Sequence, residues 1–124
     1  MTSDPRSSTD CIFCKIVDGT IPSNKLHEDE DVLAFHDVRP QAPVHFLIIP
    51  KAHVPTLYDG GMAHHKAYGK MLVLAGELAR KAGAADGFRC IINTGRVGHQ
   101  EVYHVHMHVL GGPEPMGPML ARKK

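Results

Sequence analysis

The chain of 124 residues has no tryptophan, few other aromatic residues, only three cysteines and no excess of either charge. Lys plus Arg number 14 and Asp plus Glu number 13, so a net charge of +1 gives no broad attraction to nucleic acid or to an acidic membrane surface. No apolar run approaches the roughly 18 to 20 residues that a membrane-spanning helix needs. We therefore expect neither nucleic acid nor a membrane among its partners.

The cysteines and the start of the chain bear on the cellular compartment. An odd number of cysteines does not build a disulfide framework, and the first ten residues lack the apolar segment of a secretory signal. Both features favour a reducing cytoplasm. Cys11 and Cys14 form a Cys-x-x-Cys pair, whereas Cys90 lies in an apolar run and is predicted to be a core thiol.

The organisation along the chain is simple. A chain of this length is expected to bury one hydrophobic core without disulfides. Residues 1–10 are rich in Ser, Thr and Asp and are predicted to form a disordered tail, residues 11–112 form one domain, and residues 113–124 form a C-terminal tail rich in Pro and Gly. We find no internal repeat and no linker.

The pattern of apolar residues predicts an α+β fold. Apolar side chains recur at three- and four-residue steps in residues 62–82, which predicts one main helix with Gly83 as its C-cap. Residues 11–19 predict a short N-terminal helix. Because strands and helices do not alternate along the chain, we expect an antiparallel sheet covered by the main helix. The predicted strands are residues 25–29, 32–37, 44–49, 88–93 and 101–110.

Three of the ten histidines alternate with apolar residues near the C-terminus. In a strand, His104, His106 and His108 would share one face, and the residues between them would point into the core. Three interpretations are open: a row of surface histidines, a metal site, or nucleophilic catalysis by one imidazole while its neighbours hold an anion.

The segment that contains these histidines, His-Val-His-Met-His-Val-Leu, resembles the signature of the histidine-triad (HIT) superfamily. The resemblance extends to residues 35–51, to the loop 98–103 and to Gly117-Pro118-Met119-Leu120 in the tail, and it is closest to the Hint branch of bacteria. It covers roughly residues 11–120. It implies a five-stranded antiparallel sheet, with a homodimer that extends the sheet.

The resemblance also implies an activity, the hydrolysis of purine nucleoside 5′-phosphoramidates such as adenosine monophosphate joined to an amine. His106 would attack phosphorus and form a nucleotidyl-imidazole intermediate, which water then hydrolyses. The backbone carbonyl of His104 would set the tautomer of His106, and His108 would contact the phosphate. No metal or other cofactor is required in this scheme.

Further residues would bind the purine nucleotide if the family pattern holds. Asp37 would accept hydrogen bonds from the ribose hydroxyls, and the base would lie against Ile21, Phe35, His36 and Val38. The phosphate would be held by the amide of Asn93 and by the backbone N–H groups of His99, Gln100 and Glu101, together with His106 and His108. The chain departs from the pattern at His99, where many Hint relatives have glycine.

The cysteine pair raises a second question, since some relatives bind a structural zinc. By resemblance the ligands here would be Cys11, Cys14, His45 and His104, a complete tetrahedral set. The alternative is two partly buried thiols with no metal. The histidines outside the motifs, His27, His53, His64 and His65, are predicted to be surface or loop residues.

Two other functions remain open. A dinucleotide polyphosphate hydrolase like the Fhit branch would use a similar histidine nucleophile. A nucleotide-binding regulatory or scaffold protein would keep the pocket, and catalysis in it would be incidental.

Overall fold

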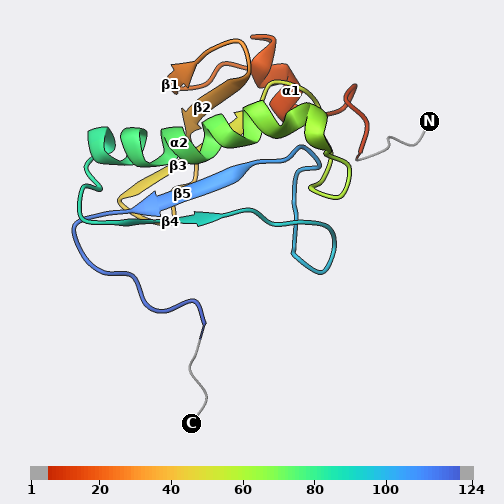
Figure 1. The fold of residues 1–124 in the computed structure, drawn as a ribbon. Coiled ribbons are helices and arrows are strands. Elements are labelled where there is room, and N and C mark those ends of the chain that lie inside the picture. The colour runs from red at the N-terminus through yellow and green to blue at the C-terminus, as the bar shows by residue number, and fades with distance from the viewer. Residues whose placement is uncertain (1–5, 121–124) are drawn as a thin grey trace.

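The computed structural model describes residues 6–120 and contains one five-stranded antiparallel sheet with the strand order β1-β2-β3-β5-β4 (Figure 1). The sheet and its helices confirm the predicted α+β fold. Four of the predicted strands differ from the observed bounds by only one or two residues. The strands are β1 Lys25–Glu28, β2 Val32–His36, β3 Val44–Pro50, β4 Phe88–Ile91 and β5 Met107–Gly111.

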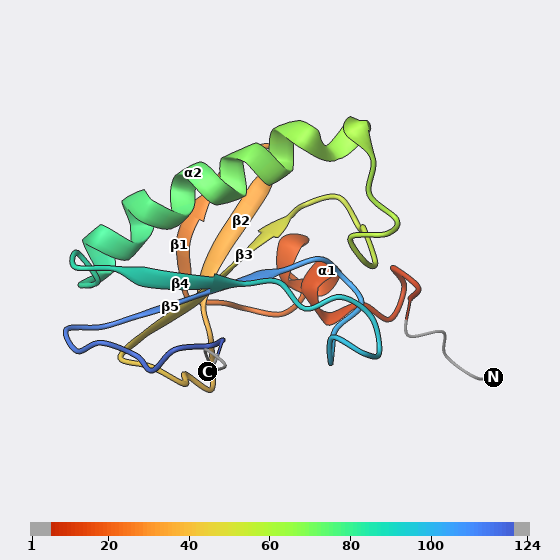
Figure 2. The same cartoon turned by 60° about the horizontal axis from the view of Figure 1, so that its bottom comes forward.

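The central strand β3 is buried along its whole length because both faces of the sheet are covered (Figure 2). Its side chains alternate between two cores. Phe46 and Ile48 belong to the core under the long helix α2, His65–Ala82. Leu47 and Ile49 belong to a smaller core on the opposite face, which the short helix α1, Ile12–Val17, covers.

The helices follow the predicted pattern closely. The predicted helix 62–82 begins as a short 3-10 turn, η1 Met62–His64, and continues as α2. Gly83 ends α2 in the left-handed conformation with φ of 110°, as a C-cap glycine should. Among residues 6–120, no helix has both the length and the apolar character needed to cross a membrane.

The last strand is shorter than predicted, and this corrects the expectation of a strand over 101–110. β5 begins only at Met107, so His104 and His106 precede it. The backbone N–H of Val105 donates to the carbonyl of Val54 at 2.7 Å, a residue beyond the end of β3. Before β5, the chain is therefore bonded to a loop rather than to a neighbouring strand. Its side chains still alternate, because Val105 and Met107 both lie in the core under α2.

The two predicted tails are only partly described. Residues 1–5 and 121–124 lie outside the described part of the chain. Within the predicted N-terminal tail, Arg6 forms an ion pair with Asp59 at 2.8 Å. Residues 113–120 contain no helix or strand, and the Arg89 side chain donates to the carbonyl of Gly117.

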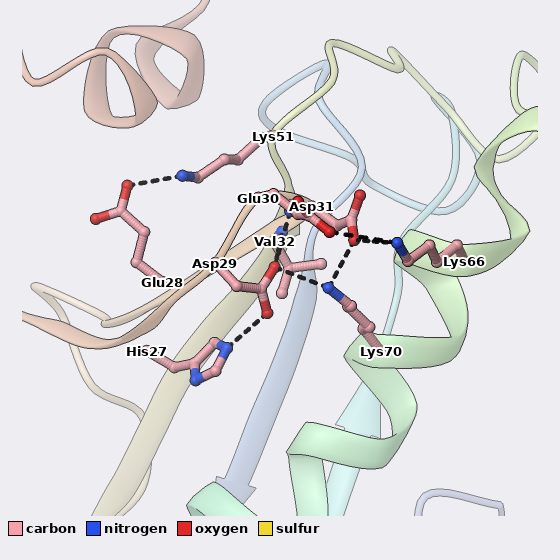
Figure 3. A network of polar contacts seen from close by, with 9 residues as sticks. All are labelled: His27, Glu28, Asp29, Glu30, Asp31, Val32, Lys51, Lys66 and Lys70. Atoms are coloured by element: carbon pink, nitrogen blue, oxygen red, sulfur yellow. Dashed lines mark hydrogen bonds and ion pairs between the residues drawn. The ribbon is translucent and has the colours of Figure 1, made fainter.

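A network of charges fastens the β1–β2 turn to helix α2 (Figure 3). Asp29 accepts hydrogen bonds from the backbone N–H groups of Asp31 and Val32 at 2.8 and 3.1 Å. The same carboxylate lies 2.7 Å from His27 Nε2 and 3.2 Å from the Lys70 ammonium. Burial alone would raise the pKa of Asp29, but these hydrogen bonds outweigh it and hold the pKa well below the ordinary value of 3.8.

Replacing Asp29 by Asn is expected to destabilise the protein by about 1 to 2 kcal/mol at pH 7, since charge-assisted hydrogen bonds are lost. A carboxyl whose pKa is lower in the folded than in the unfolded state stabilises the fold above its unfolded pKa. This contribution is lost as the pH falls from the unfolded pKa through the folded one. The difference in the free energy of unfolding between wild type and variant should therefore decrease as the pH falls from 5 to 2. Urea unfolding across that range measures it, and parallel stability curves would contradict the prediction.

Candidate active site

His106 has the environment of a nucleophile. Its ring is buried, 5% exposed, and its Nδ1 lies 2.8 Å from the carbonyl oxygen of His104. Because a carbonyl can only accept, the proton is on Nδ1, and Nε2 keeps its lone pair. Burial lowers the pKa of His106, and the contact with His104 together with the carboxylates of Glu101 and Asp37 offsets this only in part. The imidazole is therefore neutral at pH 7 and can attack.

His108 carries its proton on the opposite nitrogen. The backbone N–H of Gln41 donates to Nδ1 of His45 at 2.9 Å, so the proton of neutral His45 is on Nε2. That nitrogen lies 2.9 Å from Nδ1 of His108 and donates to it. His108 must then carry its own proton on Nε2. Two adjacent imidazoles, with ring centroids 5.2 Å apart, thus present a lone pair and an N–H donor.

Both supporting histidines are kept neutral by their surroundings. Burial, with the neighbouring rings of His106 and His45, lowers the pKa of His108 to about 4. Burial also lowers the pKa of His45, and the nearby carboxylate of Asp37 opposes this shift. The pair therefore offers a hydrogen-bond donor to an anion without carrying a full positive charge.

The two imidazoles line a hollow of about 510 Å³, which we call the catalytic hollow. It brings together most of the residues predicted to hold phosphate, and it adds Arg39, Gln41 and His45, which sequence reasoning had not placed there. Its lining residues are Asp37, Val38, Arg39, Gln41, His45, Asn93, His99, Glu101, His106 and His108.

A second hollow of about 510 Å³ adjoins the first, and we call it the nucleoside slot. Asp37, Val38 and Glu101 line both hollows, so they form one continuous site. Its walls are mainly apolar, which suits the flat faces of a nucleobase. The five residues predicted to meet the nucleoside all line it: Ile21, Phe35, His36, Asp37 and Val38.

Asp37 lies where the two hollows meet. Its Oδ1 accepts the backbone N–H of Arg39 at 2.8 Å, and its Oδ2 lies 3.4 Å from Nε2 of His45. The carboxylate is thus held in place at one oxygen. Such an acceptor between an apolar slot and a catalytic hollow is well placed for the hydroxyl groups of a sugar.

Gln100 supports the loop beside the catalytic hollow rather than facing its space. Its side-chain amide donates to the carbonyls of Pro55 and Val102 at 2.7 and 2.9 Å, and its carbonyl oxygen accepts the N–H of Gly95 at 2.9 Å. Every polar atom of this side chain is therefore directed into the protein. The prediction gave the backbone N–H of Gln100 to the phosphate, but that N–H donates to the Gly95 carbonyl at 3.0 Å, and the side chain fixes the shape of the loop.

A second cluster lies behind the triad, between α1 and the residues after β3. Cys11 Sγ lies 3.3 Å from Nδ1 of His104, and Cys14 Sγ lies 3.2 Å from Nδ1 of His53 and 3.6 Å from that of His104. In both rings, Nε2–H donates to a backbone carbonyl. The acceptor is Pro50 for His104 and Arg6 for His53. Both Nδ1 lone pairs therefore face the sulfur atoms.

This donor set fits a zinc ion. Zinc with two thiolates and two imidazoles places sulfur and nitrogen ligands about 3.5 Å apart, close to the observed 3.2 to 3.6 Å. The carbonyls behind the two rings are the outer partners that zinc-bound histidines usually have. Burial, with a contribution from Cys11, raises the pKa of Cys14 to about 12, so its thiol is neutral at pH 7 without a cation.

The sequence matches a known family model and known relatives over most of its length. The model of the HIT domain matches residues 18–114. The chain is 51% identical over 113 residues to the purine nucleoside phosphoramidase of Escherichia coli K12, covering 90% of this chain and 94% of that protein. The chain belongs to the HIT family.

Other relatives agree with this assignment. Protein HitA of Neisseria gonorrhoeae is 44% identical, covering 83% of this chain and 96% of its own length. A HIT family hydrolase from Legionella pneumophila has a TM-score of 0.82 at 44% identity, covering 88% of this chain and 98% of that one. A histidine triad protein from Clostridium difficile has a TM-score of 0.83 at 42% identity, covering 90% and 98%.

In this HIT protein, the predicted set of zinc ligands is wrong at one position. The group that gathers with the cysteines contains His53, whereas His45 lies with Asp37 and His108. The two histidines flank Pro50, where β3 ends. His45 is inside the strand and points toward the triad, and His53 follows the strand and reaches back to α1. His53 does lie in a loop and is half-buried, as predicted, but its contact with Cys14 is a role that the prediction did not give it.

Asp37, His45 and His108 form a second group whose ligand atoms all lie within 4.8 Å of one another. The tautomers of this HIT protein argue against a metal there. A metal on Nε2 of His45 would force the proton onto Nδ1, where the Gln41 N–H already donates at 2.9 Å. Two donors would then face each other. We interpret the group as a hydrogen-bonded unit that orients His108.

Proposed function

We propose that this HIT protein is a purine nucleoside phosphoramidase that works through a nucleotidyl-histidine intermediate. The observation that carries the proposal is the pair of neighbouring imidazoles in opposite tautomers, His106 with a lone pair and His108 with an N–H, in a hollow continuous with an apolar slot. The E. coli relative that is 51% identical carries this activity in its name.

In the first step, the lone pair of His106 Nε2 forms a bond to the α-phosphorus. The P–N bond breaks, its electron pair stays on the amine nitrogen, and this nitrogen takes a proton from solvent at the open mouth. The imidazole becomes a nucleotidyl-imidazolium, stabilised because its Nδ1–H still donates to the His104 carbonyl. His108 donates its Nε2–H to a phosphate oxygen, and Asn93 lies beside the same anion.

In the second step, water attacks phosphorus from the side that the amine has left. The P–Nε2 bond breaks, its electron pair returns to His106, and water releases one proton to solvent. This proton balances the one taken up in the first step, so the enzyme ends as it began. Because the Gln41 N–H fixes the tautomer of His45, the pair His45–His108 cannot relay a proton and acts as a donor only.

The direct test is amine release from an adenosine phosphoramidate, run beside a diadenosine polyphosphate at the same concentration. A phosphoramidase turns over the first much faster. Faster cleavage of the dinucleotide would point instead to a polyphosphate hydrolase. Tight binding of adenosine monophosphate with negligible turnover of both would point to a regulatory or scaffold protein.

We further propose that Cys11, Cys14, His53 and His104 hold a structural zinc, because four protein donors leave no position for substrate. The ion would supply fixed charge and crosslink α1 to the segment before β5. Through His104, whose carbonyl orients His106, it would also steady the nucleophile. Zinc binding needs both thiols reduced, the state that the cytoplasm maintains, and we place the protein there.

Zinc at about 100 times its Kd should raise the free energy of unfolding by about 2 to 3 kcal/mol. One bound zinc per chain is expected by elemental analysis, whether or not substrate is present. His53→Asn and Cys14→Ser should abolish the shift in thermal unfolding. His45→Asn and Cys90→Ser should keep it; Cys90 is exposed in β4, so the prediction of a core thiol is wrong. Loss of zinc in His45→Asn but not in His53→Asn would overturn the assignment.

We also propose that two copies pair through β4 to extend the sheet, as in the resemblance above. β4 is an edge strand, and an unpaired edge invites another strand. Phe88 is 40% exposed, and its ring would lie 3.8 Å from a Cβ at Gly76 of α2, so helix and edge form one surface. Leu72 and Val73 of α2 are also exposed.

Phe88→Glu should give monomers, because it places a charge on this apolar surface. Light scattering measures the mass of the particle in solution. A wild-type protein that is itself monomeric would refute the pairing.

A further inference from the structure

His99 is the one residue other than glycine with a positive φ among residues 6–120, at 60°. Two hydrogen bonds impose this conformation, from the His99 N–H to the Arg96 carbonyl at 3.1 Å and from the Gln100 N–H to the Gly95 carbonyl at 3.0 Å. Glycine adopts it without strain, and a side chain there costs energy. A strained residue that persists in a functional loop suggests a role for its side chain.

The His99 ring borders one part of the site only. It lines the catalytic hollow and is not among the residues of the nucleoside slot. Its side chain is 88% exposed, so it stands at the mouth of the hollow rather than at the floor. Its ligand is therefore the phosphate or the group attached to it, not the nucleoside.

The geometry of the displacement decides whether His99 meets the phosphate or the group attached to it. In an in-line displacement, the leaving nitrogen departs on the side of phosphorus opposite to the attacking Nε2 of His106. That ring is 5% exposed, so the opposite side is the open mouth. The amine and whatever it carries therefore pass the exposed side chains of His99 and Glu101.

Glu101 gives this mouth its charge. Its carboxylate side chain is 80% exposed and lines both hollows. Burial lowers the pKa of His106 and His108, and the Glu101 carboxylate is among the charges that oppose this shift, so its field reaches the reacting groups. A carboxylate here with no neighbouring ring would favour leaving amines that carry a second, cationic group. Nε2 of His99 lies 3.7 Å from Oε1 of Glu101 and stands against that carboxylate.

We propose that His99 determines leaving-group specificity, by placing its ring beside the exposed Glu101 carboxylate, where it competes with a bound cation and so reduces the preference of the enzyme for amines that bear an additional ammonium group. The inference rests on the proposed phosphoramidase function and deepens it. The substrate class it concerns is nucleoside phosphoramidates of diamines and other cationic amines, compared with neutral amines of the same length.

The test uses two adenosine phosphoramidates, of 1,5-diaminopentane and of hexylamine, whose chains match in length and differ in the terminal charge. The quantity measured is the ratio of their kcat/KM values. His99→Gly should raise this ratio in favour of the diamine about three- to five-fold, the effect of one exposed ion pair. His99→Gly combined with Glu101→Gln should return the ratio to the wild-type value. Val97→Gly, in the same loop, should leave it unchanged.

The inference is overturned when the ratio in His99→Gly stays at the wild-type value, or when the gain persists in the double variant. Wild type that hydrolyses neither compound would refute the proposed function itself, which separates the two failures. Thermal unfolding adds a second readout: relief of the left-handed strain should raise the midpoint of His99→Gly above wild type. A lower midpoint would show that the ring is held for packing, and would count against a role in specificity.

Discussion

Replacing His106 by Asn is expected to lower kcat/KM for an adenosine phosphoramidate by about 10⁴-fold or more, because the nucleophile of a covalent mechanism is removed. Its Nε2 is the one ring nitrogen of the triad that presents a lone pair to the catalytic hollow. In His104, the two nitrogens contact the Pro50 carbonyl and the cysteines. In His108, Nδ1 accepts from His45, and Nε2 carries the proton and has no lone pair to offer. No neighbouring residue can therefore take over the attack.

The same variant should still bind adenosine monophosphate within a few-fold of the wild-type Kd, since the nucleoside slot does not depend on this ring. Rapid quenching with labelled substrate should trap nucleotide on wild type at His106 and none on the variant. His65→Asn, a change on the exposed start of α2, should leave turnover unchanged. Substantial amine release by His106→Asn would contradict a histidine nucleophile.

The alternation of histidine and apolar residues predicted the arrangement of the triad better than it predicted the strand. β5 is half the predicted length, yet Val105, Met107 and Val109 still face the core under α2. Alternation needs only an extended backbone, and the Val105 N–H bond to Val54 supplies it where the ladder does not. The side-chain pattern is thus a local property, whereas strand length depends on which neighbour lies alongside.

The roles of His45 and His53 were not predictable in the same way. Both are histidines near Pro50, and nothing in their local pattern says which reaches the cysteines. The answer depends on where β3 ends and on how the chain turns back to α1, which are tertiary facts. The tautomers are even harder to predict from the sequence. A single backbone N–H, that of Gln41, fixes the tautomer of His45, and His45 in turn fixes that of His108.

His45 offers the sharpest test of this hydrogen-bonded chain, because its Nε2 lies 2.9 Å from His108 and farther, 3.4 Å, from Asp37. His45→Phe fills the buried space but removes the donor to Nδ1 of His108, so His108 no longer has a preferred tautomer. We expect kcat to fall about 10²-fold while KM changes little, since the apolar slot is unchanged and the Arg39 N–H still holds the Asp37 carboxylate. Steady-state kinetics on folded protein, verified by circular dichroism, measures the two constants separately.

His45→Gln is the matched control, because its amide N–H₂ can take the place of Nε2 and donate to His108. It should recover at least ten-fold of the activity that His45→Phe loses. A variant that merely loosened the core would not be rescued in this way, since Gln packs less well there than Phe does. Equal losses in both variants would mean that His45 serves packing alone, and that the proton on Nε2 of His108 is set by the substrate instead.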